Sequence, residues 1–531
     1  REILAPAQLD YMMEWMYSPE NLRRQMAEGH VYYIAYKDGT PCGYLSVQPE
    51  ADDLYILQKI FVLPIYELIL WAKFEHNFYK KGDYMKQRST RILSVLLAIL
   101  LFCSVLLPCS FAATAEEWDE NWDRIKNDAS AVSMFPGSDP SSMNFTWLSP
   151  TKDCVVMFEI AMDSSMKNGK FLKVERTHTA LYGWKNDVTA ENLKSNTTYY
   201  YRVAENGKWS KTYSFNTGSD KEYNVLFVSD TQIGRSGDRK LDEVLKHDSL
   251  GWNNTLEAAV KYEPDISLII SAGDQVETGI TQAQYNLFYN PELMRSIPVA
   301  TAIGNHDFYY PLYSIRSNNP NRFDRELLQC PAGKGYYFKR GEALFIVLNS
   351  NNVLTYDHEE LIKEAMNFYP DALWRVVVMH YSIYSRKEED NFYRPLFSKM
   401  FDKYDIDLVL SGHDHIYTRS ALMRGNEKVK SGGTLYLEAN TASGCNYDGQ
   451  PDKTPWYAEK CIQLRTPTYV LLNFSEGKIS IKALRSDTNE IFDSYELTKS
   501  APSKTEYKDS LLQKIYLFFA NRIFELRDII F

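Results

Sequence analysis

Five apolar segments in the second half of this 531-residue chain each end in polar residues, and this pattern constrains the fold more than any other feature. Short apolar segments bounded by turn residues are typical of buried strands. In open α/β sheets, the active site lies at the carboxyl ends of such strands. We therefore expect an α/β domain whose strand ends bring these polar residues together.

The polar residues at the five ends are mainly aspartate, histidine and asparagine. They follow strands predicted at 225–228, 266–270, after Pro298, at 374–379 and at 408–410. Glycines precede Asp274, Asn305 and His413 and permit tight turns at these positions. Carboxylates, imidazoles and amide oxygens suit a pair of cations that clamps the oxygens of a phosphoryl displacement. The candidate ligands and catalytic groups are Asp230, Gln232, Asp274, Asn305, His306, Asp307, His380, His413 and His415.

These motifs resemble those of the calcineurin-like metallophosphoesterases and, together with the β-rich segment before them, those of the purple acid phosphatase branch. The resemblance covers residues 116–500. It implies that a metal-bridging hydroxide hydrolyses a phosphate ester, with His306 beside the substrate and Asp307 orienting His306. It also implies one metal ion held by Asp230, Gln232, Asp274 and His415, and a second held by Asp274, Asn305, His380 and His413.

Two positions depart from the family pattern. Gln232 stands where the wider family has histidine and the purple branch has glycine, and its amide oxygen is a weaker candidate ligand. Glu277 stands where the purple branch has a tyrosine ligand, so no tyrosine-to-iron colour is expected, and whether Glu277 is a ligand stays open. The cofactor is therefore predicted as two divalent or trivalent ions, with Fe, Mn and Zn all compatible. The alternative function is a cell-surface binding protein with a degraded phosphatase domain.

The overall fold class predicted is multidomain, with a β-sandwich before the α/β sandwich. Residues 116–219 alternate short β-type segments with turns, which is typical of a sandwich of about 100 residues. Leu193, Thr197 and Tyr199 resemble positions of fibronectin type III domains, and the segment MFPGSDPSSMNFTWLS resembles the N-terminal domain of purple acid phosphatases. Residues 220–500 form the predicted metallophosphoesterase domain, completed by strands at 434–437, 469–474 and 478–484.

Residues 85–115 have the order of a secretory signal peptide. Basic residues precede the apolar stretch ILSVLLAILLFCSVLL, and Ala113-Thr114-Ala115 follows it. The alternative is a short membrane anchor, so the protein is predicted to be secreted or attached to the cell surface. Because 84 residues precede this segment, we hypothesise that two genes were read as one and that Met85 is the true start, with residues 67–84 as a junction.

The first 66 residues are predicted as an α/β fragment. A helix at 9–27 and strands at 31–36, 43–47 and 56–62 resemble the front half of a GNAT-type N-acetyltransferase. No glycine-rich loop follows Pro64 to bind the acetyl-CoA pyrophosphate at a helix start. We expect a truncated fragment without acetyltransferase activity.

Charge, cysteines and the tail bound the partners. A net charge of −10 disfavours nucleic acid as a partner, and the family resemblance implies a phosphate ester as the substrate. Cys445 and Cys461 flank a loop and form either a disulfide or two unpaired thiols.

The tail, residues 501–531, has apolar residues at helical spacing from 512 to 530. Its predicted amphipathic helix either contacts a membrane surface or packs on the protein.

Overall fold

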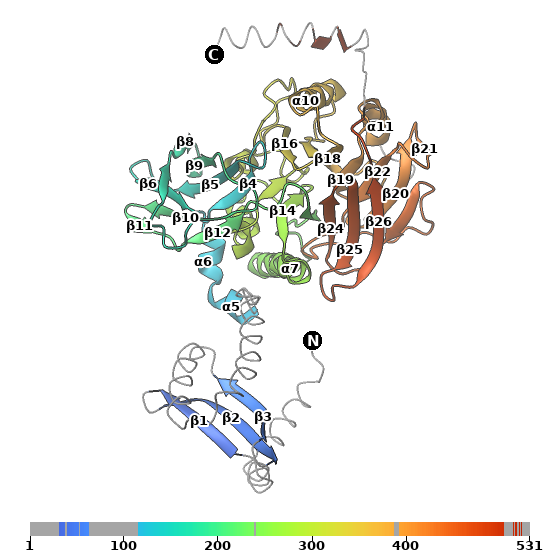
Figure 1. The fold of residues 1–531 in the computed structure, drawn as a ribbon. Coiled ribbons are helices and arrows are strands. Elements are labelled where there is room, and N and C mark those ends of the chain that lie inside the picture. The colour runs from blue at the N-terminus through green and yellow to red at the C-terminus, as the bar shows by residue number, and fades with distance from the viewer. Residues whose placement is uncertain are drawn as a thin grey trace. The chain divides into compact units, whose positions relative to one another are not determined.

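The computed structural model describes residues 31–37, 40–51, 54–62, 115–237, 240–386 and 392–503, and residues 513, 514, 516, 517, 520 and 522 (Figure 1). The chain divides into two units, residues 1–110 and residues 111–531, which we describe separately.

The first unit contains a three-stranded antiparallel sheet with β2 in the centre. Its strands are β1 (Val31–Lys37), β2 (Thr40–Ala51) and β3 (Leu54–Val62). They coincide with the three strands predicted from the sequence. The predicted helix at 9–27, the junction and the signal segment up to residue 114 lie outside the described residues, so those predictions and the GNAT resemblance stay untested.

The second unit begins with two short helices, α5 (Ala115–Glu120) and α6 (Trp122–Asn127), and continues into a β-sandwich of two antiparallel sheets. Phe145, Trp147, Phe158 and Tyr201 fill the space between the sheets, with the rings of Phe158 and Tyr201 stacked at 5.4 Å. One sheet contains β4 (Ser133–Pro136), β5 (Met143–Ser149), β9 (Gly183–Ala190) and β8 (Glu175–Thr179). The other contains β11 (Lys208–Trp209), β10 (Thr198–Glu205), β6 (Val156–Ala161), β7 (Lys170–Leu172) and β12 (Tyr213–Asn216).

Tyr199 occupies the corner predicted for it. Its hydroxyl oxygen accepts a hydrogen bond of 2.9 Å from the backbone N–H of Lys194, five residues upstream. This is the geometry of a tyrosine corner. The sandwich prediction is therefore confirmed at the level of two packed sheets, and the fibronectin type III assignment stays a prediction.

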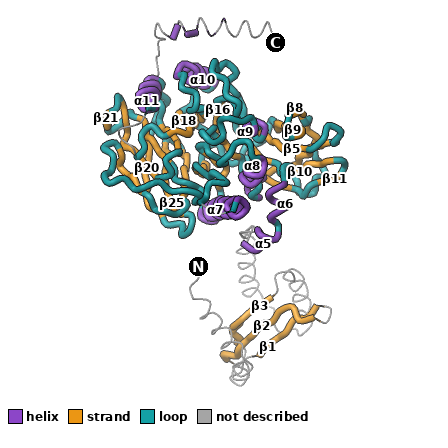
Figure 2. Tube along the Cα trace, turned by 180° about the vertical axis from the view of Figure 1, so that it is seen from behind, coloured by secondary structure: helices purple, strands orange, loops and turns teal. Residues whose placement is uncertain are grey.

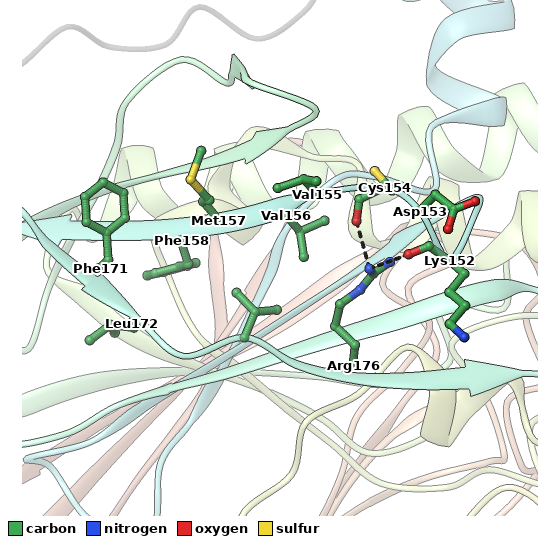
Figure 3. Close-up of a pocket in the computed structure, with 11 residues that line it drawn as sticks. Lys152, Asp153, Cys154, Val155, Val156, Met157, Phe158, Phe171, Leu172 and Arg176 are labelled. Carbon is green, nitrogen blue, oxygen red and sulfur yellow. Dashed lines mark hydrogen bonds between the residues drawn. The ribbon is translucent and has the colours of Figure 1, made fainter.

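An open cavity of about 520 Å³ lies at the edge of this sandwich, beside β6, β7 and β8 (Figure 3). Val156, Phe171 and Leu172 give it an apolar wall. The Arg176 guanidinium at one end donates hydrogen bonds to the backbone carbonyls of Lys152 and Cys154, so this cation is already engaged. None of the predicted site residues lines this cavity.

The predicted phosphoesterase domain, residues 220–500, is built on two sheets that pack face to face. The first sheet has the order β15 (Val299–Thr301), β14 (Ile266–Ser271), β13 (Tyr223–Val228), β24 (Thr468–Ser475), β25 (Lys478–Arg485) and β26 (Ile491–Thr498). The second has the order β16 (Tyr336–Arg340), β17 (Ala343–Val347), β18 (Trp374–Tyr381), β19 (Leu408–Gly412), β22 (Thr434–Glu438), β20 (Tyr417–Arg424) and β21 (Glu427–Lys428), with β23 (Ala458–Ile462) paired to β20.

Strand β13 shows how the sequence produces these layers. Val225 and Phe227 point into the core between the two sheets, whereas Leu226 and Val228 point into the core beneath the helices. Successive side chains of a strand face opposite sides, so a strand covered on both faces must be apolar throughout. The five strands predicted upstream of the polar residues are all present, as are the three predicted near the C-terminus.

Helices cover the outer face of each sheet (Figure 2). Trp252 of α7 (Leu241–Tyr262) and Phe288 of α8 (Gln282–Tyr289) pack over the first sheet. Leu361 of α10 (Thr355–Phe368) and Phe397 of α11 (Tyr393–Lys403) pack over the second. This helix–sheet–sheet–helix order is the α/β sandwich that the sequence predicts. The helices are α7 (Leu241–Tyr262), α8 (Gln282–Tyr289), the 3-10 helix η2 (Glu292–Arg295), α9 (Leu312–Ile315), α10 (Thr355–Phe368) and α11 (Tyr393–Lys403).

The described residues of the tail contact the phosphoesterase domain. Gln513 bonds Lys403 at 3.1 Å and Glu360 at 3.0 Å, and the Tyr516 ring lies 5.0 Å from that of Tyr356. These contacts favour the packing alternative over the membrane-surface alternative. Among the helices that the structure describes, none is both long enough and apolar enough to cross a membrane.

Candidate metal centre

The predicted ligands converge from both sheets of the phosphoesterase domain. Asp230 and Asp274 follow β13 and β14 of the first sheet, and His380 and His413 lie at the ends of β18 and β19 of the second. One ligand atom each from Asp274, His380 and His413 lies within 4.8 Å of the others. The strand-end rule that predicted these residues therefore brings Asp274 together with two histidines that lie more than 100 positions further along the sequence.

The backbone is left-handed at several of the predicted ligands, although none of them is glycine. Positive φ angles occur at five predicted ligands: Asp230 (48°), Gln232 (37°), Asp274 (49°), His413 (87°) and His415 (47°). Such angles cost energy for a residue with a side chain and gather at functional sites. Two glycines allow the close approach: a Cβ on Gly304 would lie 2.0 Å from Asp274 Oδ1, and one on Gly412 would lie 1.9 Å from Ser229 Oγ.

The group predicted to hold the second metal is tightly clustered. His380 Nε2 lies 3.3 Å from Asp274 Oδ2, 3.0 Å from Asn305 Oδ1 and 3.3 Å from His413 Nδ1. The opposite nitrogen, His380 Nδ1, lies 3.0 Å from the carbonyl oxygen of Ala272. A backbone carbonyl on one ring nitrogen fixes the ring and directs the other nitrogen to the metal position.

The group predicted to hold the first metal is less closely joined. His415 Nε2 lies 3.4 Å from Asp230 Oδ1, and Asp230 Oδ2 accepts a hydrogen bond of 2.9 Å from the backbone N–H of His413. Gln232 is anchored to Asp274 through its backbone, since its N–H donates to the Asp274 carbonyl at 2.8 Å. Its side-chain Oε1 lies 3.9 Å from the Sγ of Cys445.

The electrostatics of the cluster suit cations. Burial opposes the charge of Asp230, but the imidazoles of His415 and His380 hold the pKa of that carboxyl below its ordinary value. Burial likewise opposes protonation of His380, but the Asp274 carboxylate raises the pKa of that imidazole to about 9. Asp230 Oδ1 is buried and accepts no hydrogen bond. A buried oxygen without a donor calls for an ion or water, so this donor set fits a metal pair.

Asp307 is expected to orient His306, but the hydrogen bonds that the structure gives these two residues go to other partners. The His306 ring is held by Glu277, whose carbonyl oxygen lies 2.8 Å and whose Oε2 lies 3.4 Å from His306 Nδ1. The Asp307 carboxylate instead accepts hydrogen bonds from the Tyr285 hydroxyl at 2.7 Å and the Gly304 N–H at 3.0 Å. In a turn, adjacent side chains diverge, so neighbours in sequence need not touch.

Glu277 also binds Arg235. Its Oε1 lies 3.2 Å from Arg235 Nη1, on the loop that follows Gln232. The carboxylate that stands in place of the family's tyrosine therefore lies between Arg235 and His306. These contacts leave open whether Glu277 is also a metal ligand.

The disulfide alternative for Cys445 and Cys461 is wrong, since both are unpaired thiols. The Cys445 thiol lies within 3.3 Å of Thr441 Oγ1 and 3.6 Å of the Asp230 carbonyl, and burial raises its pKa to about 12. Cys461 Sγ is instead 3.6 Å from Thr418 Oγ1. Each thiol therefore packs against a different part of the domain.

Two buried carboxyl groups beside the site escaped the sequence analysis. Glu438 ends β22, its Oε1 accepts a hydrogen bond of 3.2 Å from the Asp414 N–H, and burial raises its pKa well above the usual range. The strand-end rule, applied to β22, would have found it. Asp248 in α7 accepts hydrogen bonds from the N–H groups of Gly234, Arg235 and Ser236. No sequence pattern marks that residue.

Comparison with known families gives the same assignment as the site geometry. Residues 223–417 match the family model of the calcineurin-like phosphoesterases, and residues 130–217 match that of the purple acid phosphatase N-terminal domain. The segment that matches the purple acid phosphatase N-terminal domain therefore precedes the segment that matches the calcineurin-like phosphoesterases.

Two plant enzymes and one plant structure are similar to the chain. The Fe(3+)-Zn(2+) purple acid phosphatase 12 of Arabidopsis thaliana is 22% identical over 375 residues, which are 63% of this chain and 77% of that protein. A purple acid phosphatase of Glycine max is 24% identical over 277 residues, 45% of this chain and 53% of that protein. The structure of purple acid phosphatase PPD1 from Lupinus luteus has a TM-score of 0.58 at 16% identity and covers 72% of this chain and 77% of its own.

The lupin structure shows a shared fold. The family match and the curated relatives together support a metal-dependent phosphoesterase, the enzyme class predicted from the sequence. The name of the Arabidopsis relative specifies two metal ions for that protein.

Proposed function

We propose that this protein is an exported phosphoesterase that hydrolyses phosphate esters at a binuclear metal centre. Asp230, Gln232, Asp274 and His415 would hold one ion, and Asp274, Asn305, His380 and His413 would hold the other. The observation that carries the proposal is the approach of Asp274, His380 and His413 ligand atoms to within 4.8 Å of one another from three strands of two sheets.

The ions would be Fe, Mn or Zn, all compatible with these nitrogen and oxygen donors. When bound, a metal pair lowers the pKa of water to supply a nucleophile and neutralises the charge that develops on the phosphoryl oxygens. The chain contributes a buried, pre-formed donor set, with His380 and Asp230 less than one tenth exposed. Pre-formed groups need not reorganise during the reaction.

His306 is the proposed proton donor to the leaving oxygen. Its Nδ1 is engaged with Glu277, and its Nε2 lies 3.9 Å from Asp274 Oδ2, on the side of the metal positions. Hydrolysis would form a phosphorus–oxygen bond to the attacking water, which gives up a proton, and would break the phosphorus–oxygen bond to the ester group, whose oxygen would take a proton from His306. Asp307 is proposed to act only through the loop that it binds, by fixing the Gly304 N–H.

Export is proposed from residues 85–115, which have the composition of a signal peptide. The β-sandwich is proposed to be fibronectin type III-like, supported by the tyrosine-corner hydrogen bond of Tyr199. The sandwich bonds to the catalytic domain, for example from the Tyr201 hydroxyl to the Arg295 carbonyl at 2.9 Å. We infer that it supports that domain and carries no chemistry of its own.

Metal analysis and a chromogenic assay test this proposal. The full chain should contain two metal ions and hydrolyse p-nitrophenyl phosphate, and Asp274→Asn should reduce the rate at least ~10³-fold because the shared ligand is lost. Asp371→Asn is the matched control, since its exposed carboxylate pairs with Lys339 at the surface, and it should keep both metals and activity. A metal-free, inactive wild-type chain would favour the degraded-phosphatase alternative, whose supporting observations are Gln232 and Glu277.

A further inference from the structure

Two chain segments run side by side beyond the ends of β13 and β14, past the predicted metal ligands. The N–H of Gln232 donates to the Asp274 carbonyl at 2.8 Å, and the N–H of Glu277 donates to the Ile233 carbonyl at 3.1 Å. These bonds continue the parallel pairing of the two strands. The pairing therefore carries Arg235 and Glu277 past the ligands together.

The side chains of these segments form a row with His306. Arg235 Nη1 lies 3.2 Å from Glu277 Oε1, and His306 Nδ1 lies 3.4 Å from Glu277 Oε2. At the other end of the row, His306 Nε2 lies 3.9 Å from Asp274 Oδ2. The row thus joins a guanidinium to a predicted metal ligand through the proposed proton donor.

Solvent exposure is lowest at the metal end of this row and highest at the other end. The side chain of Asp274 is 2% exposed and that of Arg235 is 46% exposed, with His306 and Glu277 between them at 30% and 22%. A phosphoryl group at the buried metal positions would leave its ester group beside His306, on the side that opens to solvent. Arg235 is therefore a cation at the outer end of the row along which an ester group would lie.

The backbone holds Arg235 in place. Its N–H donates to Asp248 Oδ2 at 2.9 Å, and a Cβ on the preceding Gly234 would lie 3.4 Å from the Cβ of Glu277. Among the residues that the structure describes, the Arg235 guanidinium bonds Glu277 alone, through Nη1. A guanidinium has five N–H groups, so one edge of it is left for a ligand.

We propose that Arg235 determines specificity by binding a carboxylate on the ester group of the substrate, several bonds away from the ester oxygen. This inference rests on the proposed phosphoesterase function and names a class of substrate. The planar fork of a guanidinium matches the two oxygens of a carboxylate. Because Arg235 and His306 contact opposite oxygens of Glu277, the ester group must span the width of that side chain. A chain of several carbon atoms between the ester oxygen and the carboxylate does so.

The test compares two substrates that differ only in the carboxylate. 6-Phosphogluconate and sorbitol 6-phosphate are both open-chain monoesters of a primary alcohol, and the carboxylate of the first is a hydroxymethyl group in the second. The full-length wild-type protein should prefer 6-phosphogluconate about fivefold in kcat/KM at low ionic strength, the effect of one half-exposed ion pair. Arg235→Gln should lower this preference to about one, mainly through KM for 6-phosphogluconate.

Conservative and remote variants separate recognition of the carboxylate from a general effect of charge. Arg235→Lys keeps the cation without the planar fork and should keep a preference of about twofold. Arg424→Gln is the matched control, since the Arg424 side chain is 47% exposed and Nη2 lies 2.9 Å from Asp405 Oδ1. It should leave both kcat/KM values unchanged.

Three results would overturn the inference. They are equal kcat/KM for the two substrates in the wild type, a preference that survives Arg235→Gln, and an equal loss of preference in Arg424→Gln. A fall in kcat/KM by the same factor for both substrates in Arg235→Gln leaves the preference intact and indicates a structural role only.

Hydrolysis of p-nitrophenyl phosphate is measured in parallel to separate this inference from the proposed function. If the wild type cleaves it without preferring 6-phosphogluconate, the inference about Arg235 alone fails. If the metal-loaded protein cleaves none of the three substrates, the proposed function fails as well.

Discussion

The two halves of the proposed metal centre differ in how the fold holds them. In the half formed by Asp274, Asn305, His380 and His413, His380 Nε2 lies between 3.0 and 3.3 Å from an atom of each of the other three. In the half formed by Asp230, Gln232 and His415, only the Asp230–His415 pair approaches comparably, at 3.4 Å. Ligands set at strand ends inherit the rigidity of the sheets, whereas Gln232 depends on a loop.

The largest effect is expected from removing His380, which lies near every other ligand of the tighter half, formed by Asp274, Asn305, His380 and His413. His380→Ala should lower kcat for p-nitrophenyl phosphate about 10³-fold and remove one metal equivalent, because it deletes a buried ligand. The control is His358→Ala, which removes another buried imidazole, in α10. His358 Nε2 lies 2.7 Å from the carbonyl oxygen of Asn352. That variant should unfold at lower temperature and retain both metals. Equal losses of activity in the two variants would contradict the assignment.

Metal removal tests whether the looser half, formed by Asp230, Gln232 and His415, releases its ion first. Ions present at 100 times their dissociation constant stabilise the folded state by about 2.7 kcal/mol, so complete chelation should lower the free energy of unfolding by a comparable amount per site. Stepwise chelation followed by calorimetry and metal analysis should show one ion leaving before the other. Chelation should change the free energy of unfolding of Asp274→Asn little, because the loss of this shared ligand already weakens both sites. Simultaneous loss of both ions would mean that the halves are equally tight.

Substituting Gln232 should change the looser half alone. Gln232→His restores an imidazole, a stronger ligand than an amide oxygen, and should raise the affinity for the first ion about tenfold. Gln232→Ala should lower it by a similar factor, with the second ion unaffected. Metal titration monitored by isothermal calorimetry measures both. If Gln232→Ala binds two ions as the wild type does, Gln232 is not a ligand.

The sequence was sufficient to predict the parts of the molecule that follow a general physical rule. Apolar segments became buried strands, and Asp274, His380 and His413 met because the carboxyl ends of their strands converge. Side-chain directions within turns were not accessible in this way. Asp307 follows His306 directly, yet it is Glu277 that holds the His306 ring. The same limit applies to Cys445 and Cys461, since residues flanking a loop in sequence can pack on different neighbours.

The smallest effect is expected from Asp248, which sequence patterns did not mark. Its Oδ2 accepts hydrogen bonds of 2.9, 2.9 and 3.2 Å from the N–H groups of Gly234, Arg235 and Ser236, and these residues follow Gln232. Three donors on one buried carboxylate oxygen are charge-assisted bonds, so Asp248→Asn weakens the support of the loop without changing side-chain volume.

This variant should therefore reduce the affinity for the first ion about 3-fold and leave the affinity for the second ion unchanged. Asp242→Asn is the control in the same helix, because its carboxylate is exposed and pairs with Lys126 at 3.0 Å. Metal titration of both variants distinguishes a local from a general effect. If Asp248→Asn lowered the affinity for both ions equally, the loop would support the whole centre. The difference between the two halves would then not come from where each ligand is attached to the sheets.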